Sequence, residues 1–155
     1  MEKSDIIRQP QVAGKFYPSS AQALKNQIEA FIDKQADKLD IIACMLPHAG
    51  YIYSGSVAAQ TVSRINIKNK IILLGPNHTG YGAKYSIMPE GTWQTPLGEI
   101  KIDSDLAGEI LNRSKHLQPD NEAHTYEHSL EVELPFFQYF KTDFEIVPIV
   151  FLSDE

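Results

Sequence analysis

The chain has 155 residues, of which 43% are hydrophobic and 22% charged, and its formal net charge is -6. The length suits a single domain over residues 1–155 with a core of its own. The acidic balance argues against a nucleic-acid-binding protein, which normally presents a basic face. No apolar run approaches the roughly 20 residues of a membrane-spanning helix. With one cysteine and no signal-type leader, the default expectation is a cytoplasmic protein whose ligand is a small molecule or a peptide.

The first predicted element is a helix over residues 21–35, preceded by serines that can cap it. Its apolar side chains recur at the spacing of one helical face: Leu24, Ile28, Phe31 and Ile32.

Two unbroken apolar runs follow, at residues 41–46 and 70–76. Short runs of this kind, bounded by Gly or Pro, are typical of strands buried on both faces of a parallel sheet. The residues 54–65 between them have helical spacing, which predicts a right-handed strand–helix–strand unit. Cys44 lies within the first run and is expected to be a small core residue.

The later elements complete an α/β pattern. Residues 85–88 and 98–102 are expected to form a second pair of strands. The sequence "TPLG" between them is typical of a turn. A helix is expected to begin at Asp103 or Ser104. Residues 127–140 have helical spacing, which Pro135 should kink or break. Residues 144–151 predict a last buried strand. The sum is a three-layer α/β sandwich with a largely parallel sheet. Because the chain ends just after this strand, we expect a domain truncated at its C-terminus and, with an edge left uncovered, a homo-oligomer.

Two histidines follow the two apolar runs at matching positions. His48 comes after the first run and a proline, and His78 comes after the second run and Pro76. Ligands of parallel α/β sheets bind beyond the carboxyl ends of the strands, and neighbouring strands lie about 5 Å apart. Two imidazoles side by side at this edge suit Fe, Zn or Cu. The alternative is that each histidine only caps a strand end.

A third polar group stands in "EAHTYEHSLE". His124 and His128 have the i, i+4 spacing of a zincin helix, but Thr125 stands where that motif needs glutamate. Glu127 also suits the first turn of a helix, where the dipole favours acidic groups. His116 is expected to face solvent.

Five motifs, in the same order, resemble the Memo family, with the bacterial and archaeal members as the nearer match. They are "AGKFYP", "PHAGYIYSG", "LLGPNH", "WQTPLGEIKID" and "AHTYEHSLEVELPF". The resemblance implies the fold of the class III extradiol dioxygenases, which are non-haem iron enzymes. It makes His48 and His78 metal ligands, and His128 and Glu131 candidate catalytic groups, His128 for acid–base work and Glu131 as an acidic partner. The family's C-terminal site histidine and site cysteine have no counterpart in these 155 residues.

Three functions follow from the resemblance and the pattern. The first is a dioxygenase-like or redox enzyme with a divalent metal, Fe²⁺ before Cu or Zn. The second is a module that binds a ligand or a peptide without turnover. The third is an inert fragment that dimerises. The resemblance also implies partners from a radical-SAM system. Ligand contacts are expected from Tyr51, Tyr53, Asn77 and His124, with Tyr81 and Trp93 as further aromatic walls.

Overall fold

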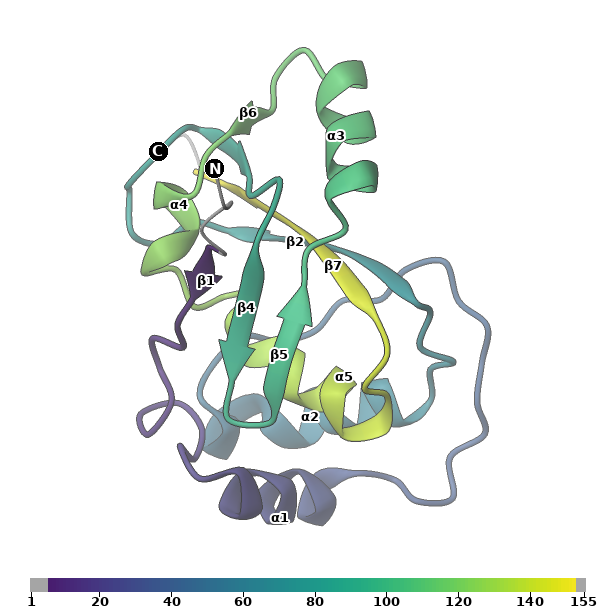
Figure 1. Ribbon diagram of the computed structural model, residues 1–155. Helices are drawn as coiled ribbons and strands as arrows, with labels where there is room; N and C mark the ends of the chain where they lie inside the picture. The colour runs from purple at the N-terminus through teal and green to yellow at the C-terminus, as the bar shows by residue number, and fades with distance from the viewer. Residues whose placement is uncertain (1–5, 153–155) are drawn as a thin grey trace.

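A computed structural model describes residues 6–152 and shows a mixed α/β architecture (Figure 1). In chain order the elements are β1 (Ile7–Arg8), α1 (Ala21–Phe31), α2 (Tyr51–Ser63), β2 (Lys70–Pro76), β3 (Tyr85–Ile87), β4 (Thr92–Thr95), β5 (Gly98–Lys101), α3 (Ser104–Arg113), β6 (Gln118–Pro119), α4 (Glu122–Thr125), the 3-10 helix η1 (Glu131–Glu133), α5 (Leu134–Phe140) and β7 (Glu145–Phe151). No helix in this part of the chain is long and apolar enough to cross a membrane.

The strands form two mixed sheets. The larger has the order β2-β7-β3-β6, and the smaller has the order β1-β4-β5. Strands β2 and β7 are parallel along their whole length, from the pair Lys70–Glu145 to the pair Pro76–Phe151, whereas β3 runs antiparallel to β7. A bridge between Ile102 and Ile146 joins the two sheets. The α/β sandwich is confirmed, and its sheets combine parallel with antiparallel pairs.

Helices α1, α2 and α5 pack together beside the sheets, at the bottom of the view in Figure 1. Ser20 caps α1 by accepting the N–H of Ala23, and the helix ends at Phe31 because Ile32 is already extended. The buried apolar residues of these helices form one core cluster with Ile146 and Val150 of β7, in which Leu24, Ile28 and Ile146 are fully buried. Val147 and Ile149 of β7 belong to a second, smaller cluster. The core therefore lies between the helices and the sheets, as the helical spacing predicted.

The predicted strand over residues 41–46 is wrong. This segment forms no strand, and Ile42, Met45 and Cys44 are exposed. A strand needs the hydrogen bonds of a neighbour, and a groove lies between this segment and β2. For the same reason β2 is an edge strand, and its Ile72 and Leu74 remain exposed. Cys44 is correspondingly not a core residue.

The pairing of the later strands also differs from the prediction. β5 pairs with β4, and residues 85–87 belong to the other sheet. The "TPLG" turn does connect two strands, and Gly98 there has φ of 126°, a conformation that side chains with a Cβ rarely adopt. Strands of three or four residues are too short for their pattern to specify a partner, so tertiary packing decided the pairing.

The helices predicted over residues 21–35 and 54–65 and the strand predicted over residues 144–151 are confirmed with small changes of boundary. The predicted strand–helix–strand unit is not formed, because its first strand is absent, and residues 127–130 of the helical pattern 127–140 are not helical. Asp103 caps α3 by accepting the N–H of Leu106 at 3.0 Å. Pro135 interrupts the pattern of residues 127–140 as predicted, since α5 begins at Leu134 with the proline in its first turn, where no N–H is needed. β7 is buried along most of its length.

Candidate functional site

Three histidines from three separate segments meet near the C-terminal end of β2. His48 lies two residues before Gly50, the N-cap of α2; His78 lies two residues after β2; and His128 precedes η1. The ring centroids of His48 and His78 are 5.2 Å apart. The rings of His78 and His128 are stacked at 4.9 Å with an angle of 20° between their planes. The predicted neighbourhood of His48 and His78 is therefore present, although the segment before His48 is not a strand.

A buried carboxylate, Glu127, holds this group together. Its Oε1 atom lies 2.9 Å from Nδ1 of His78 and accepts the N–H groups of His128 at 2.8 Å and Ser129 at 2.7 Å. Its Oε2 atom accepts the backbone N–H of His78. The side chain of Glu127 is only 1% exposed. The two segments that carry His78 and His128 are thus fixed to one another by one side chain.

The surroundings of Glu127 keep it ionised. Burial raises the pKa of its carboxyl, but the hydrogen bonds from the His78 ring and from the backbone of Ser129 and His78 outweigh burial, so the pKa is lowered. One carboxylate then serves as acceptor for four N–H groups, counting the His78 ring in its Nδ1–H tautomer. A histidine held at Nδ1 in this way presents Nε2 to a metal.

The described residues include one set of side chains that can hold a metal ion. Ligand atoms of His78, Glu127 and His128 all lie within 4.8 Å of one another. His48 stands outside this set, although its ring is next to that of His78. Because the oxygens of Glu127 already accept N–H groups, we assign it the role of positioning His78 rather than that of a ligand.

Two of the three imidazoles are held in the neutral form. Burial lowers the pKa of His48 and the nearby His78 lowers it further. Burial likewise lowers the pKa of His128, with His78 and His48 acting in the same direction and Glu127 opposing them. Neutral imidazole is the form that binds metals and accepts protons.

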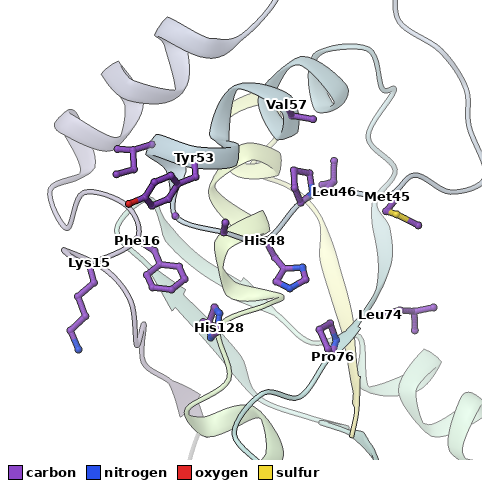
Figure 2. Close-up of a pocket in the computed structure, with 14 residues that line it drawn as sticks. Lys15, Phe16, Met45, Leu46, His48, Tyr53, Val57, Leu74, Pro76 and His128 are labelled. Atoms are coloured by element: carbon purple, nitrogen blue, oxygen red, sulfur yellow. The ribbon is translucent and has the colours of Figure 1, made fainter. Parts of the chain in front are cut away.

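A large open pocket lies beside His48 and His128. It has a volume of about 1140 Å³ and a largely apolar lining. Figure 2 shows the His48 ring in the middle of this pocket, with Phe16 and His128 on one side and Pro76 on the other. Phe16 also packs edge-on against His128, at 4.8 Å. An apolar ligand in this pocket would contact two of the three histidines.

Glu131, the first residue of η1, is fully buried. Its Oε2 atom accepts from Arg8 at 2.5 Å and from the N–H of Gln11 at 2.9 Å. Its Oε1 atom accepts from the Tyr17 hydroxyl at 2.6 Å and from the N–H of Val12 at 3.0 Å. Glu131 thus ties the N-terminal segment to the site segment, which is a positioning role.

Of the residues expected to contact a ligand, only Tyr53 lines this pocket, and it is 82% exposed. Tyr51 is buried, stacks on Phe136 and donates to the carbonyl of Val132. Asn77 is buried and organises the turn after β2, donating to the carbonyl of Tyr81.

The remaining aromatic candidates lie away from the pocket as well. His124 is fully buried and packs against the ring of buried Trp93. Tyr81 packs against Tyr126 near the turn after β2.

Sequence reasoning did not find Arg8, Tyr17 or Phe16. Arg8 stacks over Trp93 at 4.3 Å and donates to the carbonyls of His124 and Glu127 as well as to Glu131. These contacts join residues more than 80 positions apart, so no local sequence pattern predicts them. The motif "AGKFYP" contains both Phe16 and Tyr17 and was the available signal.

The family model that matches this chain and several of its relatives carry a Memo or MEMO1 family description. A family model described as "Memo-like protein" matches residues 8–155. A MEMO1 family protein of Pyrococcus abyssi is 46% identical over 97% of this chain and 55% of its own length. A MEMO1 family protein of Aquifex aeolicus is 44% identical over 93% of this chain and 54% of its own length. The chain thus spans about half the length of the curated relatives that it matches.

Proposed function

The chain belongs to the Memo-like protein family, and on this premise we propose that its histidine cluster holds a divalent transition metal, with Fe²⁺ before Cu or Zn. The supporting observation is the convergence of three histidines around a carboxylate that fixes one of them. His48 and His78 are the proposed ligands. His128 is the proposed proton-transfer group.

The donor set fits such a metal. Imidazole nitrogen is a ligand for Fe, Cu and Zn. Glu127 engages Nδ1 of His78 and leaves its Nε2 free for a metal. The lowered pKa of His48 keeps this imidazole neutral, so His48 has no proton to lose on binding at neutral pH. A carboxylate behind a ligating histidine is also the usual outer partner of a metal site.

The proposed activity is dioxygenase-like: molecular oxygen oxidises a largely apolar substrate that carries an ionisable hydroxyl group. When bound, the metal would supply redox chemistry or act as a Lewis acid. The chain's own residues bind and orient: the apolar pocket wall at Phe16, Ile52 and Tyr53 holds the substrate and limits water. His128, neutral and only 23% exposed at its side chain, accepts a proton from the substrate.

Metal analysis of anaerobically purified protein tests the assignment of ligands. We expect metal to be lost in His48→Ala and His78→Ala, and retained in His128→Ala. His116→Ala is the matched control, since His116 is exposed and packs near Tyr85. Loss of metal in His128→Ala with retention in His48→Ala would replace the proposed ligands by the His78, Glu127 and His128 group. Unchanged metal in all three variants would overturn the metal site.

A peptide-binding module is the second candidate, favoured by the size and openness of the pocket beside His48. Its exposed apolar lining includes Met45, Ile52 and Val57. Calorimetric titration with peptides, phosphotyrosine peptides included, separates the two functions. Binding that persists in excess chelator and in His78→Ala supports the module, whereas binding lost on chelation supports the metal enzyme.

A further inference from the structure

A second hollow, separate in its chemistry from the histidine cluster, runs along the free edge of β2. It is a groove of about 400 Å³ between β2 and residues 41–46, with η1 and α5 contributing from one side. Its lining is mainly apolar and includes Leu46, Ile71, Leu73, Leu130 and Phe137. The volume falls within the range of small-molecule sites.

One acidic side chain, Glu133, lines this groove. Glu133 belongs to η1 and is 6% exposed. Neither of its carboxyl oxygens has a hydrogen-bond partner among the described residues. Glu131, two residues earlier, shows the contrast, because both of its oxygens accept hydrogen bonds. A buried carboxyl without a partner is costly, and a donor from outside the chain would relieve that cost.

The cations along the groove already have partners. Lys68 lies 2.5 Å from Asp40, and Lys70 lies 2.5 Å from Asp103. The groove therefore combines an apolar wall, an unpartnered carboxyl and no free cation among its lining residues.

We propose that this groove binds a small apolar molecule that carries one protonated amino group, with the ammonium group paired to the Glu133 carboxylate and the apolar body against β2 and α5. Charge and shape both favour this ligand class, since an ammonium group supplies donors and the opposite charge in one group. The site is independent of the proposed metal function, although His48 lies where the groove meets the larger pocket.

Titration of Glu133 supports this assignment. Burial raises the pKa of its carboxyl to about 8, so the empty groove presents a neutral acid at neutral pH. On binding an ammonium ion the carboxyl proton leaves for solvent, and affinity rises with pH up to about this value. The titratable groups that interact electrostatically with Glu133 are Cys44 from the 41–46 segment and Tyr51 from α2.

Calorimetric titration of the full chain with hexylammonium, against hexanol, tests the proposal. Excess EDTA is present throughout, so that the amine cannot bind through a metal. We expect hexylammonium to bind more tightly than hexanol and to lose about tenfold or more in Glu133→Gln. Hexanol affinity should not change in that variant. Glutamine preserves the shape of the side chain, and a thermal melt establishes that the variant is folded.

A second readout uses the single cysteine. Cys44 lines the groove and is exposed, so bound hexylammonium should slow its alkylation, whereas hexanol at the same concentration should not. The proposal is overturned if hexylammonium does not bind at up to about 10 mM, if it binds equally to Glu133→Gln, or if hexanol binds as tightly. If hexylammonium bound without slowing the alkylation of Cys44, the amine would lie outside the groove, and this too would overturn the proposal.

Discussion

The Nδ1 atom of His78 lies 2.9 Å from Oε1 of Glu127, and this single carboxylate also accepts the backbone N–H groups of His128 and Ser129. The contact joins residues 49 positions apart. It couples the end of β2 to the segment before η1, so the placement of two site histidines depends on one buried acidic side chain.

Replacing Glu127 should weaken the proposed metal site without abolishing it. Glu127→Gln keeps the shape but removes the charge that holds His78, and the loss of such outer partners typically lowers metal affinity about 10- to 100-fold. Competition with a coloured chelator measures the affinity. Glu122→Gln, on an exposed residue of α4, is the control and should leave it unchanged. Equal affinity in both variants would show that His78 needs no carboxylate.

Glu131 should matter for stability. Glu131→Gln leaves the buried Arg8 guanidinium without its counter-charge, and breaking a buried pair in this way costs about 3 kcal/mol or more. Urea unfolding measures the change. The control is Glu29→Gln, which removes the partner of Lys34 in an exposed pair and should leave the midpoint unchanged. If Glu131→Gln kept full stability yet lost activity, a catalytic role would replace the positioning role.

Glu133 should make the folded state less stable as the pH rises. Its pKa is about 8 when folded and 4.5 for an ordinary glutamate, so between these values the folded state binds more protons than the unfolded state. At about 1.4 kcal/mol per pKa unit, the free energy of unfolding falls by a few kcal/mol from pH 4.5 to pH 8. Glu133→Gln should lack this decline in urea titrations across that range. A parallel decline in the variant would assign the pH dependence to other groups.

His124 should make the folded state less stable as the pH falls. Burial, with the nearby Arg8 charge, lowers its pKa from 6.5 to about 4. The unfolded state then binds more protons between pH 4 and pH 6.5, so stability is lost as the pH falls through this window. His124→Leu, which removes the titrating ring, should flatten the curve there. The exposed His116, changed to Leu, should retain the wild-type slope, and a flat curve in both variants would contradict the explanation.

Cys44 should react as an exposed but poorly acidic thiol. Its pKa is raised by partial burial first and by the Glu133 charge second. The pH midpoint of alkylation should therefore lie above that of a free thiol, and Glu133→Gln should move it down. Glu99→Gln, on β5 and outside the groove, should not. If the pH midpoint of alkylation were unchanged in Glu133→Gln, the Glu133 charge would have no effect on the pKa of Cys44.

Much of the fold followed from local pattern. The helical spacing of Leu24 and Ile28 predicted α1, and Asp103 or Ser104 was predicted to begin α3. Pro135 was predicted to interrupt the pattern of residues 127–140, and α5 begins beside it at Leu134. Each of these signals is a short-range effect of backbone geometry or hydrogen bonding, so a window of a few residues is enough to find it. The prediction of a strand at residues 41–46 was wrong because an apolar run carries no information on whether a neighbouring strand is close enough to pair.

The sequence by itself determined the family, the α/β class and the candidate role of the two histidines that follow Pro47 and Pro76. Each of these can be recognised from a short stretch of consecutive residues. Only the tertiary structure decided that His128 stacks on His78, that Glu127 fixes them, and that Tyr51 and His124 are buried. It also decided that Glu133 lines a groove and has no hydrogen-bond partner within residues 6–152. These facts depend on contacts between distant segments, and burial and electrostatic environment arise only when those segments pack.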